Sequence, residues 1–105
     1  NPNGAMSSFI NIGGRWAGGN EQLLEDVLRG EWGFRGVVST DAVLAGFMDP
    51  KLAVRYGNDL MLSILPNGVV RSVNTALDED PGVGAALRDR VHNTLYAVLQ
   101  TDAVR

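Results

Sequence analysis

A short run of β-branched residues in the middle of the chain does most to limit the possible folds. Residues 36–40 read Gly-Val-Val-Ser-Thr, and an apolar, β-branched segment of this length is typical of a buried parallel strand. Helical patterns lie on both sides of this run, and two further strand candidates occupy residues 4–9 and 59–65. Strands that alternate with helices predict parallel strands joined by right-handed crossovers.

The helical segments have recognisable ends. Residues 20–30 predict a helix with Asn20 as its N-cap and Gly30 as its stop. A short helix is predicted over residues 50–56, capped by Asp49 and started by Pro50. Residues 10–20, 66–68 and 78–82 are expected to form a glycine-rich loop, a turn and a polar connector. The last helix carries one apolar face, made by Leu87, Val91, Leu95, Val98 and Leu99.

The expected fold class is therefore α/β, with three consecutive βα units, parallel strands and one structural unit over residues 1–105. A closed (β/α)₈ barrel needs eight strands and typically about 250 residues. Three units can form only an incomplete barrel of this kind or a small doubly wound sheet. Either arrangement would leave sheet edges unpaired.

Composition argues against several classes of function. The net charge is −3 and both signs are interspersed, so no basic patch indicates nucleic-acid binding. No apolar run is long enough to span a membrane. The absence of cysteine excludes thiolate ligands and a cysteine nucleophile, and a single histidine, His92, does not indicate a metal site. We expect no metal and no cofactor, and the sequence does not indicate a cellular compartment.

Three segments match a known pattern. Residues 5–9, Ala-Met-Ser-Ser-Phe, resemble a strand with Met, two small residues and an aromatic. Residues 20–41 resemble a helix–turn–strand usually written N-x-x-L-L-x-x-V-L-R-x-E-W-G-F-x-G-x-V-x-S-D-W. Residues 56–61, Tyr-Gly-Asn-Asp-Leu-Met, resemble a segment written A-G-x-D-L-x-M. These are motifs of glycoside hydrolase family 3, the β-glucosidase family, and the resemblance implies that the three strands are strands 6–8 of its catalytic TIM barrel.

The resemblance also implies an activity. Family members are retaining hydrolases, in which a carboxylate after the seventh strand attacks the anomeric carbon and an acid/base carboxyl serves the departing oxygen and then water. Asp41 matches the nucleophile, and its place agrees with the rule that barrel chemistry gathers at the C-terminal ends of strands. The implied substrate is a β-glucoside or related sugar. The family's acid/base glutamate lies in a following domain, so we expect the isolated chain to be inactive.

Four further residues are candidates for sugar contact. Met6 matches a position that lines the sugar site, although a buried core methionine is an equal alternative. Phe9 stands where many members have Tyr. Arg15 and Trp16 lie in a glycine-rich loop that could either contact substrate or pack on itself. Ala42 replaces the usual Trp after the nucleophile, which leaves the choice of substrate open.

Other residues favour structural roles. Asp59 opens its strand whereas Asp41 closes the previous one, a separation on the order of 15 Å at about 3.3 Å per residue, so the two do not form a catalytic pair. We expect Asp59 to be a structural acid at the bottom of the barrel. Trp32 and Phe34 are expected to pin the first long helix to the barrel wall, and His92 to lie at the surface or its boundary.

Two alternatives stay open. The chain could be a non-catalytic fragment that self-associates into a homo-oligomer through its exposed sheet edges. It could also belong to an N-acetylhexosaminidase or phosphorylase branch of the same family, for which the Trp32-Gly33-Phe34 turn is less typical than for the glucosidases.

Overall fold

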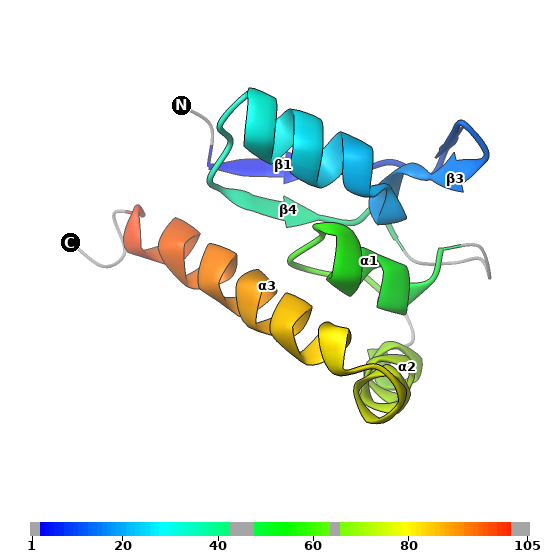
Figure 1. Ribbon diagram of the computed structural model, residues 1–105. Coiled ribbons are helices and arrows are strands. Elements are labelled where there is room, and N and C mark those ends of the chain that lie inside the picture. Colours follow the sequence, from blue (N-terminus) through cyan, green and yellow to red (C-terminus); the bar gives the residue numbers. More distant parts are fainter. Residues whose placement is uncertain (1–2, 43–47, 64–65, 102–105) are drawn as a thin grey trace.

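The computed structural model describes residues 3–42, 48–63 and 66–101. The elements are β1 (Gly4–Met6), β2 (Asn11–Ile12), β3 (Arg15–Trp16), the 3₁₀ helix η1 (Ala17–Gly19), the π-helix η2 (Gln22–Glu31), β4 (Val37–Ser39), α1 (Pro50–Tyr56), α2 (Pro66–Glu79) and α3 (Pro81–Leu99). Figure 1 shows the strands β1 and β4 side by side, with one long helix above them and the helices α1, α2 and α3 below them in that view.

The strands confirm the α/β class with parallel pairing. β1 pairs with β4 in parallel, and Met6 lies opposite Ser39. Leu60 forms a parallel bridge to Ser39 from the other side. Chain order and spatial order therefore agree across three neighbouring segments. The predicted strands over residues 4–9 and 59–65 were too long, because the first ends at Met6 and the second is reduced to the bridge at Leu60; residues 64–65 lie outside the described residues.

The sequence predicted a glycine-rich loop over residues 10–20, but part of this segment forms a hairpin. β2 and β3 form an antiparallel hairpin whose two turn residues, Gly13 and Gly14, have φ of 61° and 80°. Two-residue hairpins favour positive φ at both central positions, which glycine adopts without steric cost. The backbone N–H of Ala17 then donates to Ile10 O over 2.9 Å and closes the base of the hairpin.

The first long helix is confirmed, but it is wound as a π-helix. Asn20 Oδ1 accepts a hydrogen bond from the N–H of Leu23 over 3.1 Å, which is the capping role expected of it. At the other end, the N–H of Trp32 donates to Val27 O, a five-residue step. Trp32 is 72% exposed, so the prediction that it pins the helix was wrong. Phe34 is half-buried, with the Arg29 guanidinium 5.7 Å from its ring centre.

The next helix, α1, begins and ends as predicted. Asp49 accepts a hydrogen bond from the N–H of Lys51, Pro50 stands in the first turn, and Gly57 at φ 121° ends the helix. The predicted turn at 66–68 was wrong, because these residues form the first turn of α2, where proline is tolerated. The expected connector shrinks to Asp80, which caps α3 through the N–H of Gly82.

Asp80 also ties α1 to the start of α3. Its Oδ2 accepts a hydrogen bond from Arg55 over 2.7 Å. The Tyr56 hydroxyl, followed by the Asp80 carboxylate, raises the pKa of Arg55, so the guanidinium stays charged throughout the neutral range. The contact is half-exposed, and we assign it a role in orientation rather than a large share of stability.

Most of the apolar face expected for α3 is turned to solvent, and of its five residues Leu87 alone packs against the core. The buried residues of α3 are Val83, Arg90 and Ala97, whereas Val91, Leu95, Val98 and Leu99 are exposed, Leu95 at 57%. The helix docks through Val83 and Leu87, which pack in the second core cluster, through polar contacts from Arg90 and Asn93, and through the small side chain of Ala97. The core itself comprises two clusters, Trp16–Met48–Ala53 and Val54–Ala76–Val83, with Met61 packed against both.

Candidate active site at the end of the central strand

The chain that leads to Asp41 is held tightly. β4 ends at Ser39, and the next residue, Thr40, is fully buried. The N–H of Thr40 donates to Leu60 O over 2.9 Å, and its hydroxyl accepts from the N–H of Leu62 over 3.0 Å. Residues 60–62 therefore hydrogen-bond both the backbone and the side chain of Thr40, which precedes Asp41.

The Asp41 carboxylate is open on one side. The residue is half-buried, and its Oδ1 accepts a hydrogen bond from the N–H of Ala42 over 2.8 Å. Within the described part of the chain, no cation forms an ion pair with Asp41. The hydrogen bond from Ala42 orients the carboxylate through its own backbone.

Buried polar side chains link the ends of the strands. The N–H of Ser7 donates to Ser39 O over 2.9 Å, and the Ser7 hydroxyl donates to Asn58 Oδ1 over 3.3 Å. The Asn58 amide donates in turn to Gly18 O, so β1, β4, η1 and the end of α1 share one network. The sequence had indicated neither Ser7 nor Asn58 nor Thr40 as a site residue. The sequence signal that could have found them is position: Asn58 follows the glycine that ends α1, and Ser7 and Thr40 follow β1 and β4.

The predicted sugar-contact residues differ in accessibility. Met6 is 64% exposed, and Phe9 and Arg15 are also exposed, so Met6 is not a buried core residue. Trp16 is 3% exposed and packs in the core with Met48. Its indole N–H donates to Ser8 O over 2.9 Å. This environment favours the packing interpretation of Trp16 and leaves Met6, Phe9 and Arg15 as the residues that a ligand could reach.

Two grooves among the described residues border β1. A groove of about 810 Å³ is lined by Gly4, Trp32, Arg35 and Gly36, residues at or before the starts of β1 and β4. A groove of about 240 Å³ lies between β1 and η2 and includes Met6 and Ser7. Asp41 lines neither of these two grooves.

Asp59 lies well before Asp41 along the strands. Its N–H donates to Val38 O over 2.7 Å, which places it level with a residue three positions before Asp41. Its side chain is fully buried and paired with Arg29 and Arg90, so it is a structural acid. His92 is exposed. Among the described residues, no group of three or more His, Cys, Asp or Glu could hold a metal ion, and no helix is long and apolar enough to cross a membrane.

Similarity to known proteins points to glycoside hydrolases. No family model matches the chain. β-Glucosidase B of Emericella nidulans is 46% identical over 41 residues, 39% of this chain and 5% of that protein. A probable β-glucosidase J of Aspergillus fumigatus is 42% identical over 40 residues, 38% of this chain and 5% of that protein. The chain thus spans about a twentieth of the length of these curated relatives.

Solved structures match over a larger share of the chain. A β-N-acetylhexosaminidase from Beutenbergia cavernae has a TM-score of 0.77 at 26% identity, over 90% of this chain and 33% of that one. A β-glucosidase of intestinal bacteria involved in saponin metabolism has a TM-score of 0.63 at 25% identity, over 94% of this chain and 15% of that one. The chain is similar to family 3 glycoside hydrolases.

A third solved structure matches the fold of this chain. The fungal multi-domain GH3 β-N-acetylglucosaminidase has a TM-score of 0.63 at 18% identity, over 87% of this chain and 13% of that one. Both glucosidases and hexosaminidases of the family 3 type therefore contain an arrangement like β1, β4 and their helices.

Proposed function

We propose that the chain is the nucleophile-bearing part of a retaining β-glycosidase of family 3, with residues 1–105 forming strands 6–8 and the C-terminal part of its barrel. The observation that carries the proposal is Asp41 itself. It lies two residues after the end of the parallel strand β4, it is half-exposed, and no described cation neutralises it. The pattern of residues 20–41 adds support from sequence.

The proposed reaction has two steps. An Asp41 oxygen attacks C1 of the sugar and forms a glycosyl ester, while the bond from C1 to the leaving oxygen breaks and that oxygen takes a proton from an acid/base carboxyl. Water then attacks C1, gives its proton to the same carboxyl, and releases the sugar and the free Asp41 carboxylate. The acid/base carboxyl belongs to another part of the whole protein, and this chain supplies the oriented nucleophile.

The substrate proposed is a β-glucoside with a non-reducing-end sugar. The curated relatives that match in sequence carry β-glucosidase names, which favours this choice. The hexosaminidase match favours an N-acetylhexosaminidase as the alternative. Aryl β-glucoside and aryl N-acetyl-β-glucosaminide, compared as substrates of the full-length protein, would separate the two by their kcat/KM values.

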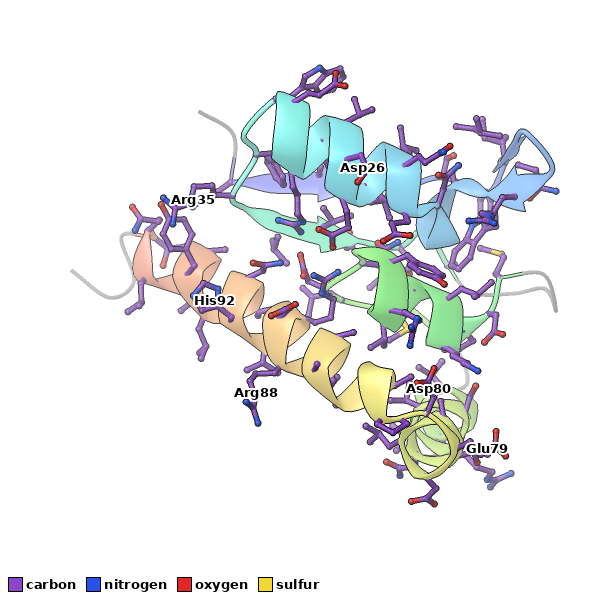
Figure 2. All side chains as sticks on the ribbon, viewed as in Figure 1. Asp26, Arg35, Glu79, Asp80, Arg88 and His92 are labelled. Atoms are coloured by element: carbon purple, nitrogen blue, oxygen red, sulfur yellow. The ribbon has the colours of Figure 1, made fainter. Side chains whose placement is uncertain are left out.

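The decisive experiment is covalent trapping of the full-length protein with a 2-fluoro glycoside, followed by peptide mass spectrometry. We expect the label on the peptide that contains Asp41, and we expect Asp41→Asn to lower turnover by about three or more orders of magnitude. Asp26→Asn is the matched control, because Asp26 is an exposed carboxylate on η2 (Figure 2). A label on another carboxylate, or full activity of Asp41→Asn, would refute the proposal.

The isolated 105-residue chain should not hydrolyse an aryl β-glucoside, because it lacks an acid/base partner and the walls of a sugar pocket. Removal of one member of a catalytic pair typically costs orders of magnitude in rate. Steady turnover by the isolated chain that disappears in Asp41→Asn would contradict the division of the site between this chain and the rest of the protein.

A self-associating, non-catalytic fragment is the second candidate, and the exposed face of α3 favours it. Val91, Leu95, Val98 and Leu99 form an apolar stripe on a surface helix, and within the described residues β1 and Leu60 each have one unpaired side. Such surfaces promote association. Light scattering of the isolated chain should give a mass above that of a monomer; a monomer of 11.2 kDa would count against this function.

A further inference from the structure

A buried cluster of charges joins three elements at the base of β4. We call it the Asp59 cluster, made of Glu25, Arg29, Asp59, Arg90 and Asn93. Arg29 Nη2 lies 2.6 Å from Asp59 Oδ2, and Arg90 Nε lies 3.2 Å from Asp59 Oδ1. The Asn93 amide donates to Asp59 Oδ1 over 3.0 Å, and Arg90 Nη1 pairs with Glu25 Oε1 over 2.9 Å. η2, β4 and α3 are therefore tied to one carboxylate.

The cluster holds the backbone of β4 as well as side chains. Asp59 Oδ2 accepts a hydrogen bond from the N–H of Val38 over 2.8 Å, and the N–H of Asp59 donates to Val38 O over 2.7 Å. Arg29 Nη1 donates to Gly36 O over 2.9 Å. Both polar groups of Val38 and the carbonyl at the entrance of β4 are thereby fixed, so a slip of this strand would break several charged contacts together.

The segment after Asp59 controls the other end of β4. Leu60 O accepts from the N–H of Thr40, and the N–H of Leu62 donates to the Thr40 hydroxyl. Asp41 follows directly. The same short stretch that is anchored by the Asp59 carboxylate therefore sets the residue immediately before the proposed nucleophile. The distance from anchor to nucleophile is three residues of extended, hydrogen-bonded chain.

We infer that Asp59 is a positioning residue for Asp41, acting with Arg29 through the register of β4 against residues 60–62. The inference rests on the proposed function. Burial of several charges is costly and often adds little to stability compared with apolar packing. A reacting carboxylate, however, must be held within a small tolerance, because a displacement of about 1 Å can cost about a hundredfold in rate.

The test is the rate of covalent trapping in the full-length protein, measured with a 2-fluoro glycoside at a temperature where each variant is folded by circular dichroism. Asp59→Asn and Arg29→Lys should slow the first-order labelling of Asp41 by about tenfold or more and leave the inhibitor dissociation constant within about twofold. Arg29→Lys keeps the charge but cannot bridge Gly36 O and Asp59 with one planar fork.

Asp80→Asn is the matched control, because Asp80 forms an ion pair with Arg55 at the α2–α3 junction and does not contact β4. It should label at the wild-type rate. If Asp59→Asn does not fold, Arg29→Lys decides. Labelling of Asp41 at the wild-type rate in the folded variants would overturn the positioning role alone, whereas wild-type protein labelled at a residue other than Asp41 would overturn the proposed function.

Discussion

Replacement of Arg90 by methionine tests whether the polar face of α3 is what docks the helix. Arg90 is 5% exposed although it lies on a helix with a well-formed apolar stripe. Methionine keeps an unbranched stem of similar reach and removes the guanidinium. The Arg90→Met variant loses the pair with Glu25 and the ion-pair contact with Asp59, and it keeps the packing of the stem.

The magnitude follows from the contacts that remain. Removal of one partner from a buried ion pair typically costs about 3–5 kcal/mol. In Arg90→Met, Asp59 keeps Arg29, the N–H of Val38 and Asn93, and Glu25 is accessible enough to be hydrated. We therefore expect a smaller loss of about 2–3 kcal/mol in the free energy of unfolding. This is a substantial part of the roughly 5–15 kcal/mol typical of a domain.

Urea unfolding of the 105-residue chain, followed by circular dichroism, measures the loss. With a slope of about 1–3 kcal/mol per molar urea, a loss of about 2–3 kcal/mol should lower the midpoint by about 0.7–3 M. Arg88→Met is the control on the same helix, because Arg88 points away from the body in Figure 2 and is exposed; it should change stability by less than about 0.5 kcal/mol. Equal midpoints for the two variants would refute polar docking of α3.

Three other substitutions test the packing of Trp16 and the exposed stripe. A Cβ on Gly18 would collide with the Trp16 indole, so Gly18→Ala should destabilise the chain by about 1–3 kcal/mol. Gly68 has open space where a Cβ would stand, so Gly68→Ala should be neutral or stabilising by up to about 1 kcal/mol. Thermal unfolding of the two variants measures the difference in stability. Leu95→Glu should leave the unfolding midpoint nearly unchanged, because Leu95 is solvent-exposed, and should lower the mass measured by light scattering; a large loss of stability would mean that the stripe is core.

The order of elements was predictable because each depends on local signals. Asp49 and Pro50 start α1 and Gly57 ends it, as cap and stop residues do wherever they occur. The β-branched run at 37–39 likewise forms the central parallel strand. The place of Asp41 two residues after that run could be read from sequence for the same reason.

The buried face of α3 was not predictable from hydrophobic periodicity. The periodic apolar residues predict one face, but the helix turns the buried Arg90 and the half-buried Asn93 towards Asp59. Asp59 is distant in sequence, so no local pattern indicates these contacts. The sequence could not decide whether Trp16 and Met6 are buried or exposed, for a similar reason. Trp16 is buried by the approach of Gly18 and Met48, a tertiary event that no local pattern encodes. The roles of Ser7 and Asn58 also depend on contacts across the strand ends.

The hydroxyl of Thr40 has a structural role, although it stands beside the carboxylate proposed to be catalytic. The family pattern has Ser before its carboxylate and this chain has Thr40, and the oxygen shared by both side chains accepts the N–H of Leu62. That oxygen serves the architecture of the adjoining segment, not the sugar. We therefore expect relatives that have abandoned hydrolysis to exchange the carboxylate freely and still retain serine or threonine one place earlier, while valine, the closest match to threonine in shape, should be rare there.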